Sequence, residues 1–79
     1  MEIRVNQEAK QKRLDNTIQD IISRAKSVAN MGIDQFVYEI PDGVSTYQVS
    51  EGVLKETNNT VYVPSRGISG LKIKFCIKH

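Results

Sequence analysis

The sequence of 79 residues contains one cysteine, one histidine and no tryptophan. Because Cys76 is alone, no disulfide can form within the chain. Cys76 and His79 are the only residues of their types, so the chain lacks the additional histidines or cysteines that would complete a metal site or a catalytic Cys–His pair. We therefore expect no catalytic residue, no bound metal and no cofactor, and we predict that the protein is not an enzyme.

Long apolar runs are also missing from the chain. No segment approaches the roughly 18 apolar residues of a membrane span, and residues 1–7 lack the apolar core of a secretion signal. These absences favour a cytoplasmic protein that contacts no membrane. With 39% hydrophobic residues, the chain is apolar enough to fold, and its length allows a single domain over residues 1–79.

Acidic residues are absent from the last part of the chain. Residues 1–31 carry six basic and four acidic groups, residues 32–60 carry one and five, and residues 61–79 carry four and none. The formal net charge of +2 therefore hides a basic, an acidic and a second basic segment. Such a distribution favours oriented docking on a partner over uniform attraction to a polyanion.

The most regular pattern in the chain is a helical stripe. Apolar residues recur at helical spacing over residues 14–29. Asn6 is suited to cap the start of the helix, and Gly32 can supply the left-handed residue that ends it. We predict a helix over residues 7–31 whose polar first turns project beyond the core, while residues 1–6 form either an edge strand or more helix. The polar residues on its other side are expected to face solvent: Arg13, Asn16, Asp20, Arg24, Ser27 and Asn30.

Two elements are predicted in the middle of the chain. Residues 35–40 alternate and are rich in aromatic and β-branched side chains, which is typical of a strand. Residues 44–57 fit either a strand paired with it or a short helix capped by Ser45. Two adjacent apolar residues near their end would give a strand no consistent face, so we predict a short helix over residues 45–56.

The last part of the chain is predicted to form a β-hairpin over residues 60–77, with strands at 60–63 and 71–77. One face of the last strand is apolar and packs in the core, and the other carries lysines. The apolar residues are Leu71, Ile73, Phe75 and Ile77. The order α-β-α-β-β predicts an α+β fold, in which a long N-terminal helix packs on one face of a small, mainly antiparallel sheet.

The candidate partner-binding residues are basic side chains and tyrosines. If Tyr62 points outward beside the lysines of the last strand, ring and cations together suit a phosphate backbone and a stacked base. The same lysines are also explained as protection against edge-to-edge association of the sheet. Basic residues at the start of the first helix fit a solvated helix end as well as a binding site. The full candidate set is Tyr47, Tyr62, Arg66, Lys72, Lys74, Lys78, Lys10 and Arg13.

The order of elements resembles that of small accessory proteins of tailed phages. In those proteins an amphipathic helix and a glycine lead into a strand that ends in Ile-Pro, followed by a short helix and a hairpin. The corresponding segments here are Leu14–Ala29, Gly32, Phe36–Pro41, Val49–Leu54, Val61–Val63 and Leu71–Phe75. The resemblance implies a protein that acts in the host cytoplasm by binding host factors, and it defines no functional residues.

These observations predict a non-enzymatic protein-binding module, which in a phage would bind and inhibit a host or defence protein. The alternative is a small nucleic-acid-binding protein that uses the basic face of the C-terminal hairpin. A third interpretation is a self-associating subunit that pairs through the 35–40 or the N-terminal strand edge. The expected state is therefore a monomer or a small homo-oligomer.

Overall fold

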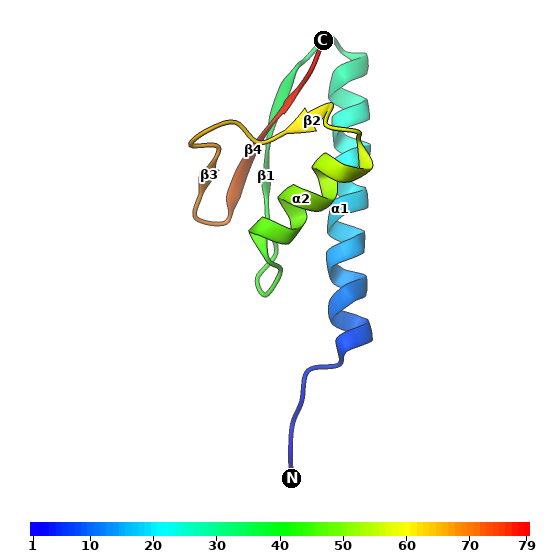
Figure 1. The fold of residues 1–79 in the computed structure, drawn as a ribbon, viewed down its shortest axis with the longest axis vertical. Coiled ribbons are helices and arrows are strands. Elements are labelled where there is room, and N and C mark those ends of the chain that lie inside the picture. Colours follow the sequence, from blue (N-terminus) through cyan, green and yellow to red (C-terminus); the bar gives the residue numbers. More distant parts are fainter.

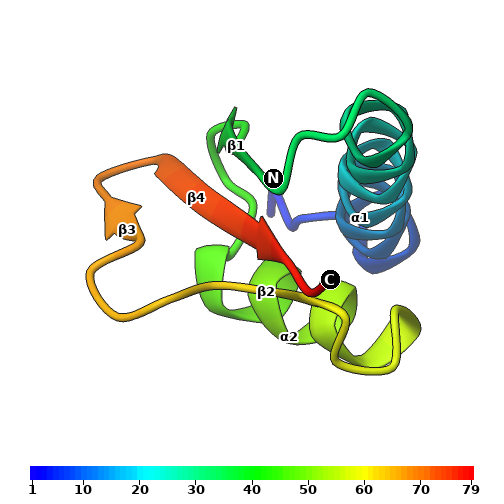
Figure 2. The ribbon, with the colours of Figure 1, turned by 90° about the horizontal axis from the view of Figure 1, so that it is seen from above.

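A computed structural model describes all residues from Met1 to His79. Both helices cover one face of a small antiparallel sheet and leave the other face open (Figure 1, Figure 2). The elements are α1 (Gln7–Asn30), β1 (Gln35–Glu39), α2 (Thr46–Glu56), β2 (Val61–Tyr62), β3 (Ile68–Ser69) and β4 (Lys72–Ile77). This arrangement confirms the predicted single small α+β domain with a long N-terminal helix.

Local hydrogen bonds set both ends of α1. At its start, the Asn6 side chain accepts a hydrogen bond of 3.0 Å from the Ala9 N–H. At its end, Gly32 has a φ of 78°, which lets the Ile33 N–H donate to the Val28 carbonyl at 2.9 Å. The helix therefore ends at Asn30, one residue before the predicted end.

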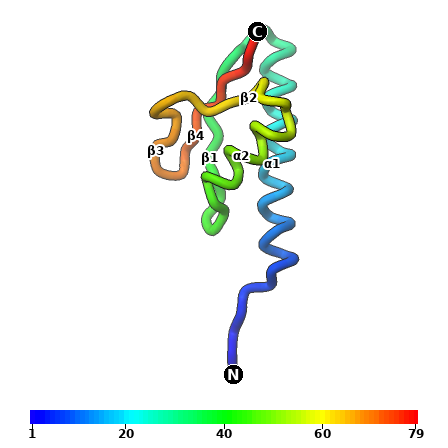
Figure 3. Tube along the Cα trace, in the orientation of Figure 1, coloured from blue at the N-terminus to red at the C-terminus, as the bar shows by residue number.

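The first turns of α1 and the segment before them project from the rest of the fold (Figure 3). The molecule is accordingly elongated, with extents of 53 × 21 × 18 Å. Residues 1–6 form neither of the predicted structures, since they belong to no strand and lie outside the helix. Ile3 and Val5 are largely exposed in this segment because no element packs against them.

The polar residues expected on the solvent side of α1 are exposed, and three of them also contact the β1 side of the fold. Arg13 donates a hydrogen bond of 2.8 Å to the Asp42 carbonyl. Asp20 accepts one of 2.5 Å from the Tyr38 hydroxyl, and the Arg24 guanidinium lies 5.2 Å from the centroid of the same ring. The flank of α1 beside the buried stripe thus faces β1, which helical periodicity alone does not show.

The second helix forms where Ser45 was expected to cap it. The Ser45 hydroxyl accepts a hydrogen bond of 3.3 Å from the Gln48 N–H. Gly52 faces α1 at the position of Ile18, where a Cβ atom would collide with that side chain. Residues 46–56 are helical, so the alternative strand over residues 44–57 is wrong, and the glycine lies where α2 packs against Ile18 of α1.

Strand β4 is the centre of the sheet. β1 pairs with it on one side, and β2 and β3 pair with it on the other, all antiparallel. The register sets Phe36 opposite Phe75, whose rings stack at a centroid distance of 5.4 Å. The most completely buried side chains come from both helices and the sheet: Ile21, Ile40, Val49, Val53, Ile73 and Phe75.

The predicted hairpin forms, but its first strand is interrupted. Tyr62 pairs with Cys76, and Ile68 pairs with Ile73. The segment from Tyr62 to Ile68 therefore advances six residues while the paired part of β4 advances only three. Pro64 lacks the N–H that a continuous ladder would need, and Arg66 has a φ of 64°. The interruption creates β3, which was not predicted.

The prediction that Leu71 lies in the core is wrong. Leu71 is 43% exposed, as is its neighbour Ile68 at 47%. Both belong to the corner of the sheet around β3, which lies away from both helices (Figure 2). Alternation along a strand predicts which face a residue occupies, but it does not predict how much of that face the helices cover.

Candidate interaction surface on the open sheet face

The open face of the sheet is the face turned away from α1 and α2. Because side chains alternate along each strand, the register arranges this face in three rows across the strands. The rows are Gln35–Cys76–Tyr62, Val37–Lys74–Gly67 and Glu39–Lys72–Ser69. Lys78 follows Cys76 by two residues and extends the face beyond the first row.

The lysines of the open face form no ion pair. The ion pairs in the structure join Arg4 to Glu2 and His79 to Asp34. Lys72, Lys74 and Lys78 are therefore cations without a carboxylate partner, although Glu39 lies opposite Lys72 in the register. Unpaired charges on one side of a strand create a positive potential that attracts anionic groups.

Tyr62 joins this basic surface. The Lys78 ammonium lies 6.0 Å from the centroid of the Tyr62 ring, at the outer limit of a cation–π contact. Its register opposite Cys76 places Tyr62 on the open face, next to Lys78, which directly follows β4. The contact orients a flat aromatic side chain next to a positive charge, which suits an interface anchor or a stacked base.

A shallow hollow of about 320 Å³ lies at the end of the open face. Asp34 is among its lining residues, and its carboxylate lies 3.0 Å from the His79 ring. The lining residues are Asp34, Gln35, Tyr62, Cys76, Ile77, Lys78 and His79. The hollow therefore combines an aromatic ring, a lysine and an amide with one carboxylate at its margin.

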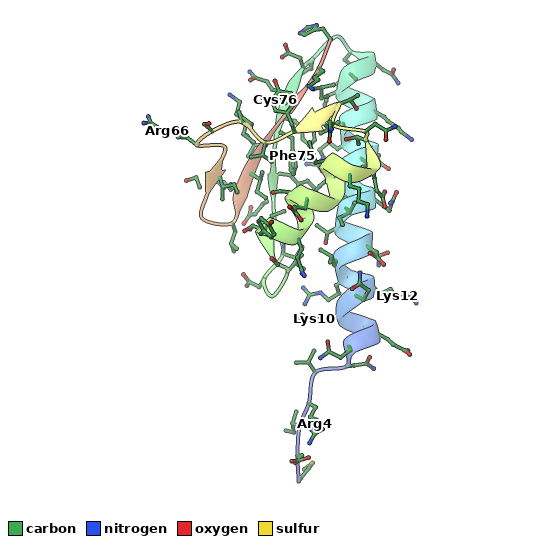
Figure 4. The ribbon with its side chains drawn as sticks, in the orientation of Figure 1. Arg4, Lys10, Lys12, Arg66, Phe75 and Cys76 are labelled. Atoms are coloured by element: carbon green, nitrogen blue, oxygen red, sulfur yellow. The ribbon has the colours of Figure 1, made fainter.

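The remaining basic candidates lie elsewhere. Arg66 is at the tip of the segment between β2 and β3 and points away from the sheet, far from Lys10 on α1 (Figure 4). Arg13 uses its guanidinium to hold the turn at Asp42. Lys10 and Arg13 line a hollow beside that turn, so the structure separates them from the lysines of the open face.

Tyr47 is also separate from the open face, because α2 lies on the opposite side of the sheet. Its ring is largely exposed, and its hydroxyl donates a hydrogen bond of 2.8 Å to Glu51. This bond to a carboxylate raises the pKa of Tyr47 above the usual value of 10.0. The tyrosine pair predicted as anchors thus occupies two different surfaces.

The open face contains residues that sequence reasoning did not select. Val37 is in the middle of β1, opposite Lys74 of β4, and its side chain is 57% exposed. Gln35 and Cys76 complete the row that contains Tyr62. The alternation of residues 35–40 could have identified Gln35 and Val37, because it places the odd-numbered residues on the sheet face opposite Phe36.

Family models, curated proteins and solved structures were compared with the chain, and none of the three comparisons found a match. The resemblance to accessory proteins of tailed phages therefore stays a prediction. Neither helix combines the length and apolar character needed to cross a membrane. No three side chains of the His, Cys, Asp and Glu types gather where they could hold a metal ion.

Proposed function

We propose that the protein is a non-enzymatic binding module whose open sheet face docks on an acidic surface of a protein partner. The proposal rests on three lysines that follow one another along the open face of β4 and beyond its end, Lys72, Lys74 and Lys78. None of them has an ion-pair partner, and Lys78 lies beside the ring of Tyr62. Complementary charge would steer the encounter, and the tyrosine would supply the buried anchor. The resemblance to phage accessory proteins supports a host or defence protein, bound and inhibited in the host cytoplasm, as this partner.

The charge around the open face favours a protein over a polyanion. Glu39 lies in the row at one end of the face, and Asp34 lies at the other end. Both carboxylates would repel a phosphate backbone that ran along β4, whereas a folded partner can set a basic group against each. The lysines are also too few to neutralise a long stretch of nucleic acid.

Affinity capture with three matched baits tests this proposal. The baits are the natural chain, Lys74→Glu/Lys78→Glu on the open face, and Lys12→Glu/Lys26→Glu on α1, which makes the same charge change. We expect the natural chain and the α1 variant to capture one stoichiometric partner with an acidic surface, insensitive to nuclease. The open-face variant should lose it while keeping the same circular dichroism. Retention of that partner by the open-face variant would contradict the proposal.

A second candidate function is the binding of single-stranded nucleic acid. The observation that favours it is the placement of Lys78 beside the Tyr62 ring, since such pairs hold a backbone and stack a base. Contacts from three lysines would make the affinity fall about 20-fold between roughly 50 and 200 mM salt. Fluorescence anisotropy with labelled RNA and DNA oligonucleotides measures this, and both Tyr62→Ala and Lys74→Glu/Lys78→Glu should abolish it. Unchanged anisotropy at low salt would eliminate this function.

A further inference from the structure

The two edges of the sheet differ in how they are protected. The β2 and β3 edge consists of two-residue strands separated by Pro64 and by Arg66 with its positive φ. Short strands, proline and local distortion are devices that prevent another strand from pairing with an edge. β1 is a continuous strand of five residues, Gln-Phe-Val-Tyr-Glu, and contains no proline, glycine or lysine.

The free edge of β1 presents a regular set of backbone groups. The Ile40 N–H donates to the carbonyl of Leu71, just before β4, at 2.7 Å, and the Asp34 carbonyl accepts from the Ile77 N–H of β4 at 2.8 Å. In an antiparallel ladder this phase directs the N–H and C=O groups of Gln35, Val37 and Glu39 to the free side. No strand of the chain pairs there, and β1 lies at the margin of the molecule (Figure 2).

We propose that β1 is a self-association edge, on which a second copy of this chain pairs antiparallel through its own β1. The two-fold axis of the pair passes beside Val37. This register uses all five residues of β1 in both copies and forms about six backbone hydrogen bonds. It also sets each exposed Val37 against its counterpart, and pairs of β-branched residues stabilise neighbouring strands.

Charge disfavours the neighbouring register that is centred on Glu39. With the axis at Val37, Gln35 of one copy lies opposite Glu39 of the other, so no like charges face each other. With the axis at Glu39, two carboxylates would lie directly opposite, which destabilises a strand pair. The pairing would join the two sheets with their open faces on the same side and place a Lys74 on each flank of the valine pair.

The edge pair is small, so the association is expected to depend strongly on concentration. Stable interfaces bury roughly 1,200–2,000 Å², and a single strand pair buries less. Sedimentation velocity from micromolar to millimolar protein should therefore show a shift from the monomer to the dimer mass. The same series on a chain lacking residues 1–5, which keeps the helix cap Asn6, should give the same shift. Loss of the dimer on this deletion would overturn the proposal, because the N-terminal segment of the second copy would then be the occupant.

Two variants of Val37 test the edge itself. Val37→Pro removes the N–H on the free side without removing a bond to β4, and Val37→Thr keeps the N–H and the branched side chain. We expect Val37→Thr to dimerise like the natural chain and Val37→Pro to stay monomeric with the same circular dichroism. A natural chain that stays monomeric at millimolar concentration, or a folded Val37→Pro that dimerises, would overturn the proposal.

Disulfide trapping tests the register and does not depend on a proline variant. In a Cys76→Ser background, Val37→Cys places two thiols in a hydrogen-bonded pair whose Cα atoms lie about 5.5 Å apart, within disulfide range. The matched control is Gln35→Cys, whose counterparts would lie four residues apart along the strand, at about 14 Å. We expect rapid cross-linking for Val37→Cys only, and Gln35→Cys should cross-link when mixed with Glu39→Cys. Equal cross-linking of the two single variants would overturn the register.

Discussion

Gly52 of α2 lies directly against the side chain of Ile18 of α1. A Cβ atom at Gly52 would fall well inside van der Waals contact with Ile18 Cδ1 and 3.2 Å from its Cγ1. Ile18 is buried in the core, so it has little room to move. The absence of a side chain at Gly52 therefore sets how closely the two helices approach.

We expect Gly52→Ala to lower the free energy of unfolding although alanine is the better helix former. The helix propensity of alanine contributes about 1 kcal/mol in its favour, but overpacking a core costs about 1–3 kcal/mol. The net loss should be about 1 kcal/mol, measured by urea denaturation followed by circular dichroism.

The matched control is Ile18→Val, which removes the Cδ1 atom that the new Cβ would meet. This change alone should cost about 0.5–1.5 kcal/mol. In the Ile18→Val chain, however, Gly52→Ala should become neutral or stabilising. An equal effect of Gly52→Ala in both chains would show that the contact with Ile18 is not the cause.

The helices and strands of this fold can be predicted from residues near their own ends. The distances at which these elements pack against one another cannot. Asn6, Ser45 and Gly32 act on their own helix ends, so the sequence predicted α1 and α2 almost to the residue. In the sequence alone, Gly52 is a glycine inside a predicted helix, which counts only as a helix-propensity cost of about 1 kcal/mol relative to alanine. The contribution of Gly52 to the packing of the two helices depends on Ile18. That residue is 34 positions away in the chain and is brought near only by packing.

The candidate site shows the same division. Alternation placed Tyr62 and the lysines of β4 on one face because strand geometry is local. It did not predict that Arg13 would hold the turn at Asp42, or that the Tyr47 ring would lie on the other side of the molecule. Those outcomes depend on how α1 and α2 are oriented against the sheet.

Arg13 provides a second test, because it links α1 to the turn after β1. Arg13→Ala removes the hydrogen bond to the Asp42 carbonyl and should cost about 1 kcal/mol. Lys12→Ala removes a neighbouring charge that makes no such bond, and its effect should stay within about 0.5 kcal/mol. Hydrogen exchange at the Val44 N–H, which bonds to the Pro41 carbonyl at 3.2 Å, should accelerate in the Arg13 variant only. Equal exchange rates in both variants would refute the role given to Arg13.

Gly67 is enclosed by two backbone carbonyl groups and by the side chain of Val63, whose Cγ1 would lie 2.8 Å from a Cβ atom at this position. A Cβ atom there would lie 2.9 Å from the Pro64 carbonyl oxygen and 3.1 Å from that of Lys74. The Val63 side chain could rotate, but the two carbonyl oxygens cannot, so Gly67→Ala should lower the free energy of unfolding by about 1–3 kcal/mol. Gly70→Asn is the control, because its φ of 61° suits asparagine and no atom lies near its Cβ position. A loss at Gly70 as large as that at Gly67 would contradict the explanation.

The Tyr38 hydroxyl should lose its proton at a higher pH than an ordinary tyrosine. Burial, then the hydrogen bond from its hydroxyl to Asp20, raise the pKa of Tyr38 from 10.0 to about 12. Absorbance titration of the chain should therefore contain a component near pH 12 that Tyr38→Phe removes. Because burial is the larger cause, Asp20→Asn should lower this pKa only part of the way towards 10. Asp15→Asn, also on α1, should leave it unchanged.

The same pKa makes stability depend on pH with a defined sign. Below pH 10 the Tyr38 hydroxyl is protonated in both states, so its contribution to stability is fully present. Between about pH 10 and 12 the unfolded chain releases this proton while the folded chain retains it, so the free energy of unfolding falls. The fall should be smaller in Tyr38→Phe, which has no proton to release, when both chains are unfolded in urea at several values of pH. Parallel losses of stability in the two chains would show that the folded state does not hold this proton more tightly than the unfolded one.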